Sequence, residues 1–325
     1  MVDYILPEKV VSNDELKSIF PDFDSEKLSG KIGIDRRHVA APGETALDLA
    51  YKASSRILEK SGADIDFILL CTQSPDYLLP SSACILQDRL GLDQQTGAMD
   101  FSLGCSGFVY GLGLAKGLIL GNMARNVLLV TAETYSKHIH PGDKANRGIF
   151  GDAAAAAVIS ACGEEKIGEF VFGTDGSGFE QLIVKNSGQR NRDAADPDEY
   201  TYGDGNITSD AHLYMNGPDI FNFTIETIPG IIEETLEKNR VTREEVDYYI
   251  LHQANQFMLD YLRRKIKVGR EKFYNNIREV GNTVSATIPI GLTESLGSGT
   301  IKKGDRVLVA GFGVGLSWGA TMITV

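Results

Sequence analysis

The chain has 325 residues, 42% of them hydrophobic and 8% aromatic, which suits one large two-part domain or two ordinary ones. Its formal net charge of −12 argues against nucleic acid as the main partner, because phosphate binding relies on Lys and Arg. The four cysteines show neither a CxxC spacing nor a metal-ligand pattern, as is typical of reduced thiols. We see no signal peptide and no apolar run of membrane-spanning length, so the sequence predicts a cytoplasmic protein without a metal site or a membrane partner.

Helix-like and strand-like segments alternate along the first half of the chain. Apolar periodicity predicts a helix over residues 45–61 that Gly62 ends, and a continuous apolar run predicts a buried strand over 67–71. The same signals predict a helix over 81–90 and strands over 126–131 and about 151–159. This alternation indicates an α/β fold with a mostly parallel sheet.

A cysteine lies between small residues at the start of one apolar segment. Residues 108–120 are apolar on nearly every side, which predicts a helix buried in the middle of the protein. Cys105 falls at the N-terminal end of this helix, where free N–H groups and the helix dipole stabilise an anion. The position predicts a thiol with a lowered pKa that reacts as a thiolate. A small buried cysteine without a catalytic role is the alternative.

The second half of the chain resembles the first. The strand predicted over 246–252 lies 181 residues after the segment 65–71, and the same offset relates 306–309 to 125–128. One offset at two separate strands implies two similar α/β halves, although generic strands can also look alike by chance. We place an N-terminal half carrying the cysteine at 1–175 and a C-terminal half at 176–325.

The C-terminal half supplies polar groups that can face the cysteine. His252 directly follows a buried strand, at the edge of an α/β sheet where ligand sites collect, although a lone histidine can also be a satisfied core residue. Asn282 lies in a Gly-Asn turn before the helix that the repeat pairs with the Cys105 helix. A nucleophile, an acid–base group and a hydrogen-bond donor that converge in this way are suited to acyl chemistry.

The motifs Gly-Cys-Ser-Gly-Phe at 104–108, His-Gln-Ala-Asn at 252–255, Gly-Asn-Thr at 281–283 and the glycine-rich segment 313–320 resemble those of the 3-oxoacyl-(acyl-carrier-protein) synthase III family. This family belongs to the thiolase-like condensing enzymes. The resemblance runs from about residue 4 to the end of the chain. It implies a five-layered αβαβα fold made of two pseudo-repeated halves, and a homodimer.

The resemblance also implies a reaction and its catalytic residues. Cys105 would take an acyl group from acyl-CoA or an acylated acyl carrier protein (acyl-ACP), and the carbanion formed by decarboxylation of malonyl-ACP would then attack this acyl-enzyme. His252 and Asn282 would donate hydrogen bonds to the malonyl thioester, and the backbone N–H groups of Cys105 and Val314 would form the oxyanion hole. No tightly bound cofactor is implied, because the CoA or phosphopantetheine thioesters are themselves the substrates.

Several positions depart from the family pattern or bear on the substrate. Where the family has a Trp and an Arg at the CoA entrance, this chain has Lys27 and Lys31, and Phe257 replaces an arginine linked with carrier-protein docking. The first strand of the family is expected to be missing or abbreviated. The implied substrate- and CoA-binding residues are Lys31, Arg147, Asn255 and Leu79, of which Leu79 stands where a Phe can close the acyl pocket of the neighbouring subunit.

A basic segment follows the His252 strand in this acidic protein. Arg263, Arg264, Lys265 and Lys267 form either an ordinary solvated helix face or a docking site for an acidic acyl carrier protein, and we favour docking.

Two other functions remain open. A non-condensing acyltransferase could use the same cysteine to acylate an amine or a hydroxyl. A silent subunit that pairs with an active homologue is less favoured, because it has no need of Cys105, His252 and Asn282 together. A degradative thiolase generally has a second catalytic cysteine in the glycine-rich segment, and residues 312–319 contain none.

Overall fold

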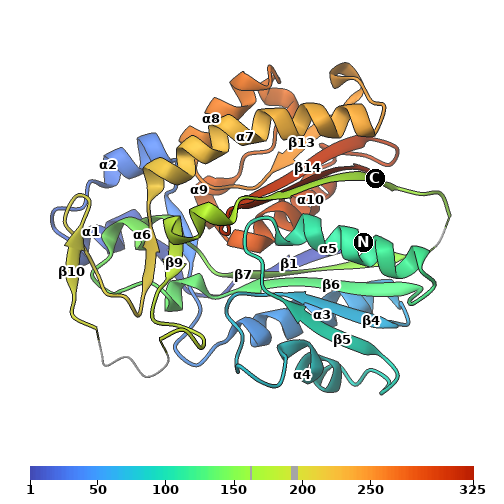
Figure 1. Cartoon of the computed structure of the whole chain (residues 1–325), viewed down its shortest axis with the longest axis horizontal. Coiled ribbons are helices and arrows are strands. Elements are labelled where there is room, and N and C mark those ends of the chain that lie inside the picture. Colours follow the sequence, from blue (N-terminus) through green and yellow to red (C-terminus); the bar gives the residue numbers. More distant parts are fainter. Residues whose placement is uncertain (162, 192–196) are drawn as a thin grey trace.

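Two β-sheets form the frame of the computed structural model, which describes residues 1–161, 163–191 and 197–325 (Figure 1). The first sheet has the strand order β1-β7-β6-β4-β5. Its strands are β1 (Val2–Ile5), β4 (Phe67–Cys71), β5 (Gly97–Phe101), β6 (Asn126–Glu133) and β7 (Ala153–Ser160). The second sheet has the order β13-β14-β15-β8, with β8 (Ile167–Thr174), β13 (Tyr248–Leu251), β14 (Arg306–Gly313) and β15 (Ser317–Thr324).

Helices lie between the two sheets and on both outer faces. Helices α5 (Gly107–Leu120) and α10 (Thr287–Gly297) share one core cluster with strands of both sheets. Helices α3 (Ala46–Ser61) and α4 (Ser82–Arg89) cover the outer face of the first sheet, and α7 (Gly217–Lys238) and α8 (Gln256–Lys265) that of the second. Figure 1 shows the resulting succession of α7 and α8, sheet, α5 and α10, sheet, and α3 and α4. The predicted αβαβα layering is confirmed.

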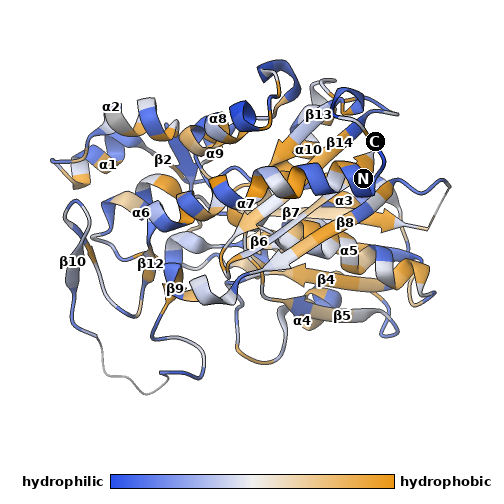
Figure 2. Ribbon diagram, turned by 45° about the horizontal axis from the view of Figure 1, so that its top comes forward, coloured by the Kyte–Doolittle hydropathy of each residue, from blue (hydrophilic) through white to orange (hydrophobic). Residues whose placement is uncertain are grey.

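Hydropathy follows these layers. Figure 2 shows largely hydrophobic strands, such as β4 and β7, in the interior, and mixed hydrophilic and hydrophobic residues on outer helices such as α8. Helix α5 is apolar along most of its length because it is covered by both sheets, as its sequence predicts.

The ends of α3 follow from single residues. The Thr45 side chain accepts the N–H of Asp48, and the Asp48 carboxylate accepts the N–H of Thr45, which forms a capping box. At the other end Gly62 adopts a left-handed conformation with φ 60°, as a terminating glycine does. The predicted helix and its stop are confirmed.

One prediction about the sheets is wrong. The sheets are mixed rather than mostly parallel, because β1, β7, β8 and β15 all run antiparallel to their neighbours. The first strand, expected to be missing or abbreviated, is present as a short strand: β1 pairs with β7 over four residues, from Val2 opposite Ala157 to Ile5 opposite Ala154.

The two halves correspond element by element. Strand β13 begins 181 residues after β4, and α10 begins 180 residues after α5. Strand β8 pairs antiparallel with β15 as β1 pairs with β7. The division into 1–175 and 176–325 stays a prediction, and β8, which precedes that boundary, is hydrogen-bonded within the second sheet.

Shorter elements surround one end of the two sheets. The remaining strands and α-helices are β2 (Val10–Ser12), α1 (Asn13–Ile19), α2 (Ser25–Lys27), β3 (Arg36–His38), α6 (Lys144–Ile149), β9 (Leu182–Val184), β10 (Tyr200–Tyr202), β11 (Asn206–Thr208), β12 (Leu213–Met215) and α9 (Ile277–Val280).

Among the described residues, no helix combines the length and apolarity needed to cross a membrane.

Candidate active site

Cys105 lies in the turn between β5 and α5, two residues before the helix begins. It is 6% exposed, and the glycines of β14 lie directly against it. A Cβ atom at Gly313 would fall 2.9 Å from both Cβ and Sγ of Cys105, and one at Gly311 would fall 2.6 Å from the Cys105 carbonyl oxygen. Only residues without a side chain let the strand pass so close to the cysteine.

The electrostatic surroundings of the thiol differ from the prediction. Burial, followed by the Glu133 carboxylate, raises the pKa of Cys105 to about 12, whereas a lowered pKa was expected. The physical reason is that β14 and its neighbours enclose the sulfur, so that desolvation outweighs the helix N-terminus. The backbone N–H groups of Val314 and of Cys105 itself bond to the sulfur and favour the thiolate. They are the two groups predicted to form the oxyanion hole, and that role stays a prediction.

His252 follows β13, and its backbone N–H donates to the Ala310 carbonyl at 2.8 Å. Burial lowers the pKa of His252 to about 3, so the ring is neutral at physiological pH. Its Nδ1 lies 2.8 Å from Oγ1 of Thr287, and that hydroxyl donates to the Val284 carbonyl at 3.1 Å. Because a hydroxyl has one hydrogen, Nδ1 must carry the ring proton and Nε2 keeps a free lone pair.

Asn282 is held in a turn between the two halves of the molecule. Its backbone N–H donates to the Ile149 carbonyl at 2.9 Å, and its own carbonyl accepts from Gly151 at 3.0 Å. Its side-chain Oδ1 accepts the N–H of Val284 at 2.9 Å, which fixes the orientation of the amide. The Nδ2 group is therefore the end of this side chain that remains to donate to a substrate.

Val284 connects these groups. Its side chain packs in one cluster with Cys105, and a Cβ atom at Gly104 would meet both Val284 and Val314. Its N–H is bound by Asn282 and its carbonyl by Thr287, the hydroxyl that also contacts His252. The structure thus brings the three predicted catalytic residues to one place.

Glu133 also belongs to this place, although no motif in the sequence points to it. It is fully buried at the end of β6. Its carboxyl accepts the N–H of Gln73 at 3.1 and 3.3 Å and lies 3.3 Å from Ser74 Oγ and 3.1 Å from Ser285 Oγ. An acidic residue at the end of an apolar strand was the only signal that the sequence offered.

The predicted substrate-binding residues lie in different settings. The Lys31 ammonium is 5.6 Å from the centre of the Phe257 ring, and the Arg147 guanidinium donates to the Pro141 carbonyl at 2.8 Å. Asn255 caps α8 by accepting the N–H of Met258 at 2.8 Å, which gives its side chain a structural task. Leu79 is 83% exposed. The side chain of Lys27 lies outside the described part of the structure.

The basic segment at the end of α8 divides into two groups. Arg263 is only 15% exposed and donates to the Val268 carbonyl at 3.0 Å, so it stabilises the end of the helix. Arg264, Lys265 and Lys267 are exposed. These three side chains, not Arg263, are free to meet a partner.

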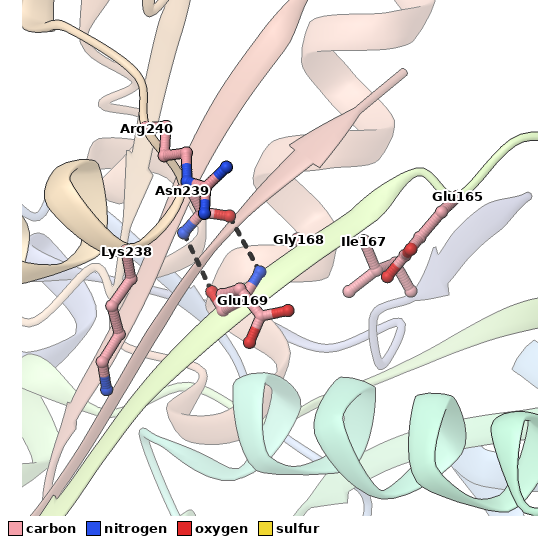
Figure 3. Close-up of a pocket in the computed structure, with 7 residues that line it drawn as sticks. All are labelled: Glu165, Ile167, Gly168, Glu169, Lys238, Asn239 and Arg240. Atoms are coloured by element: carbon pink, nitrogen blue, oxygen red, sulfur yellow. Dashed lines mark hydrogen bonds between the residues drawn. The ribbon is translucent and has the colours of Figure 1, made fainter.

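A surface hollow of about 400 Å³ lies at the opposite end of the second sheet (Figure 3). Asn239 bridges it, with Nδ2 donating to the Glu169 carbonyl at 3.0 Å and Oδ1 accepting the Glu169 N–H at 2.8 Å. It is lined by Glu165, Ile167, Gly168, Glu169, Lys238, Asn239 and Arg240. Because Ile167 begins β8 and the cysteine faces the other end of the sheet, this hollow is separate from the candidate site.

Comparison with known proteins points to one family. Residues 99–176 match the model described as 3-oxoacyl-[acyl-carrier-protein (ACP)] synthase III, and residues 236–325 match the model of its C-terminal part. A beta-ketoacyl-[acyl-carrier-protein] synthase III of Clostridium perfringens is 37% identical over 322 residues, which cover 98% of this chain and 95% of the relative.

Solved structures agree with this match. A crystal structure of a 3-oxoacyl-(acyl-carrier-protein) synthase III is 48% identical with a TM-score of 0.96, covering 100% of this chain and 98% of that one. A beta-ketoacyl-[acyl-carrier-protein] synthase III of Thermus thermophilus is 33% identical with a TM-score of 0.89, covering 100% and 98% of the two chains.

Proposed function

Because the chain belongs to the 3-oxoacyl-[acyl-carrier-protein] synthase III family, we propose that Cys105, His252 and Asn282 are its catalytic residues. The protein is an acyltransferase that condenses an acyl thioester with malonyl-ACP in fatty-acid biosynthesis. The observation that carries the assignment of residues is the Val284 turn, since it binds Asn282 directly and His252 through Thr287 while its side chain packs against Cys105.

The first step is transfer of the acyl group to the cysteine. The sulfur attacks the thioester carbon of acyl-CoA or acyl-ACP, and the thiol proton moves to the free Nε2 of His252. This transfer is needed because the enclosed thiol holds its proton tightly. The N–H groups of Cys105 and Val314 stabilise the oxyanion that forms when the sulfur attacks. As this oxyanion collapses, the departing CoA or ACP thiolate takes the proton from His252.

The second step is decarboxylation of malonyl-ACP and attack on the acyl-enzyme. Nδ2 of Asn282 donates to the malonyl thioester carbonyl as the enolate forms and carbon dioxide leaves. Nucleophilic attack of the carbanion on the acyl carbon releases the Cys105 sulfur as a thiolate. One proton from solvent, which the decarboxylative condensation consumes overall, restores the thiol. Donation by His252, which the family resemblance implies, requires a proton on Nε2, so the neutral ring would have to carry its single proton there instead of on Nδ1.

The entrance to the site contains groups suited to the CoA or phosphopantetheine arm. Lys31 carries a positive charge at the surface beside the Phe257 ring, and Arg147 lies with its guanidinium 5.4 Å from the Phe20 ring. A cation beside an aromatic face suits a phosphate and a purine. Asn255 is assigned mainly to capping α8. No tightly bound cofactor enters the proposed reaction. Because the substrates are CoA and carrier-protein thioesters, we infer that the protein acts in the cytoplasm.

A homodimer accounts for apolar surface on this chain. Strands β5 and β8 are each one of the two edge strands of their sheets, and α5 packs between the sheets and contacts β8. Each of the three elements exposes a large apolar side chain: Met99 at 42%, Leu114 at 43% and Phe172 at 44%. Tyr77, Leu78 and Leu79 are exposed in the loop before α4. Edges and apolar side chains of this kind are usually covered, and a second copy that covers them would receive Leu79 at its acyl pocket.

The acyl carrier protein is the second partner. We assign its docking to Arg264, Lys265 and Lys267, which are exposed at the end of α8, the helix that directly follows the His252 strand. An acidic partner would be steered to these charges although the chain as a whole carries −12.

Intact-mass measurement tests the proposed function. The wild type should gain one acyl group from a panel of acyl-CoAs, the Cys105→Ala variant should gain none, and malonyl-ACP should discharge the adduct with release of carbon dioxide. An adduct that malonyl-ACP does not discharge would instead favour acyl transfer to an amine or a hydroxyl. Failure of every acyl donor to react would refute the assignment of Cys105.

A further inference from the structure

One buried carboxyl beside the site has no part in the steps above. Glu133 is 0% exposed, and its side chain forms no ion pair with Lys or Arg in the described parts of the chain. A carboxylate in such surroundings is costly, whereas a neutral carboxylic acid with hydrogen-bond partners is not. The carboxyl has three partners, the N–H of Gln73 and the hydroxyls of Ser74 and Ser285. As donors they favour the carboxylate, but burial outweighs them and raises the pKa of Glu133.

These partners come from both halves of the molecule. Gln73 and Ser74 follow β4 of the first sheet, and the Gln73 side chain accepts a hydrogen bond from Tyr135 at 2.5 Å and would touch a Cβ atom at Gly104. Ser285 lies three residues after Asn282, next to the turn of Val284. Glu133 therefore links the segment beside the cysteine to the turn that presents Asn282.

We propose that Glu133 is a positioning residue that works as a neutral carboxylic acid: it joins the Gln73–Ser74 segment to Ser285, holds the turn that presents Asn282, and disables the condensation when it loses its proton. The inference rests on the proposed function, because it assigns a task within that reaction. The two carboxyl oxygens of Glu133 contact different residues: one lies beside the Ser285 hydroxyl and the other beside the Ser74 hydroxyl.

The hydrogen bonds accommodate the proton. Ser74 Oγ accepts the N–H of Thr134 at 3.3 Å and lies 3.0 Å from Nε2 of His138. Burial lowers the pKa of His138, so the ring is neutral and can accept the Ser74 hydrogen. The protonated carboxyl of Glu133 can then donate its hydrogen to the Ser74 oxygen, and every hydrogen in the row has an acceptor.

Loss of the proton would act on the site in two ways. A carboxylate offers no hydrogen to Ser74, and it adds a negative charge that raises the pKa of the Cys105 thiol and opposes the enolate. Burial raises the pKa of Glu133 to about 8, so this change falls just above physiological pH.

The other titratable groups around Glu133 lie elsewhere on the pH scale. Cys71, Cys105 and Tyr135 have pKa values raised well above 9, and the pKa of His138 is lowered. In the C-terminal half, His252 has a pKa of about 3. Asp152 also has a raised pKa, and its charge contributes to raising the pKa of Glu133.

The test compares pH profiles of carbon dioxide release from malonyl-ACP on the acylated enzyme. With a pKa of about 8, the wild type should fall at pH 9 to about a tenth of its pH 7 rate. Glu133→Gln keeps a neutral group of the same size and should lose less than about two-fold over this range. Asp152→Asn should keep the decline but move it to a lower pH, because it removes a charge that raises the pKa of Glu133. Equal profiles for the wild type and Glu133→Gln, or a folded Glu133→Gln that is inactive at pH 7, would overturn the proposal.

Infrared difference spectra give a readout that does not depend on activity. A band of a buried protonated carboxyl should be present in the wild type at pH 7, diminish towards pH 9 and be missing in Glu133→Gln. A wild type that lacks the band at pH 7 would overturn the inference even if it condenses. A wild type that shows the band but releases no carbon dioxide would instead refute the proposed function.

Discussion

The side-chain oxygen of Asn282 accepts the backbone N–H of Val284 at 2.9 Å, across a turn in which Val284 has a φ of 55°. A β-branched residue rarely adopts this left-handed conformation, so the surrounding contacts must hold it. They do so on both sides, because Thr287 donates to the Val284 carbonyl at 3.1 Å. The same two contacts orient the Asn282 amide and the His252 ring, so the strained residue and the catalytic groups stabilise one another.

Thr287 is expected to set the protonation of His252. In Thr287→Val the Nδ1–H loses its acceptor, and the ring can place its proton on Nε2, where it no longer accepts from the thiol. We expect acylation of Cys105 to slow by about 10–100-fold, as when the partner that orients a histidine is removed. Rapid-quench mass measurement of acyl-enzyme formation checks this. Thr287→Ser should recover most of the rate, and an unchanged rate in Thr287→Val would contradict the assigned tautomer.

Gly313 is expected to tolerate no side chain. A methyl group there would fall 2.9 Å from Sγ and Cβ of Cys105, so the strand or the cysteine must move. Gly313→Ala should reduce acyl-enzyme formation by about 100-fold or more, since small displacements of a reacting group have effects of this size. Overpacking should also lower the free energy of unfolding by about 1–3 kcal/mol.

A helix glycine in open surroundings is the control for that substitution. A Cβ atom at Gly230 in α7 would meet no atom within 4 Å. Gly230→Ala should keep full acylation activity and gain about 0.5–1 kcal/mol of stability, because alanine favours the helix. Equal activity of the Gly313 and Gly230 variants would show that β14 does not crowd the cysteine.

The local elements could be predicted from the sequence more readily than their directions. The apolar run of β4 and the capping signals of α3 belong to single segments, and both predictions are confirmed. The antiparallel course of β15 follows from a short turn after Gly313, which brings the chain straight back along β14. The glycine-rich segment 310–319 indicates this strand, turn and strand, whereas no single segment indicates that β1, β7 and β8 also run antiparallel to their neighbours.

The sequence predicts which residues form the site, but it does not predict how burial changes their pKa values. Cys105, His252 and Asn282 stand in motifs, whereas the raised pKa of the thiol depends on the strand that covers it. Glu133 stands in no motif, since its character comes from segments 59 and 152 residues away in the chain.

The apolar strip formed by Met99, Leu114 and Phe172 predicts the oligomeric state. Leu114→Asp places a charge in the surface proposed to be covered by a second copy, where an unpaired charge is costly. The wild type should sediment as a dimer, and Leu114→Asp as a monomer or a much weaker dimer. Ile19→Asp, at a similarly exposed apolar residue on α1, should leave the dimer intact. A monomeric wild type at micromolar concentration would refute the proposal.

Charge reversal tests the docking surface. The double variant Arg264→Glu and Lys265→Glu should raise the KM for carrier-protein substrates by about 10-fold at low salt, because electrostatic attraction becomes repulsion. The difference should shrink at high salt, and the KM for CoA thioesters should stay unchanged. Lys302→Glu with Lys303→Glu makes the same charge change at another exposed site and should leave carrier-protein kinetics unaltered. Equal effects of the two pairs would mean that only net charge matters.

The stability of the protein should fall as the pH rises towards 8, because of Glu133. Burial raises its pKa from 4.5 to about 8, so the folded state holds a proton that the unfolded state releases. The stabilisation is fully present below about pH 4.5 and is lost as the pH approaches 8. Since each pKa unit corresponds to about 1.4 kcal/mol, this group alone should account for about 3–4 kcal/mol between pH 5 and pH 8.

Urea unfolding of Glu133→Gln over the same pH range isolates this contribution. The variant cannot lose a proton at this position, so its free energy of unfolding should decline less steeply than that of the wild type between pH 5 and pH 8. Glu245→Gln removes an exposed carboxylate whose pKa is lowered by hydrogen bonds from Thr242, and it should keep the wild-type slope above pH 5. Parallel curves for the wild type and Glu133→Gln would mean that Glu133 is already ionised in the folded protein, and the neutral acid beside Cys105 would have to be abandoned.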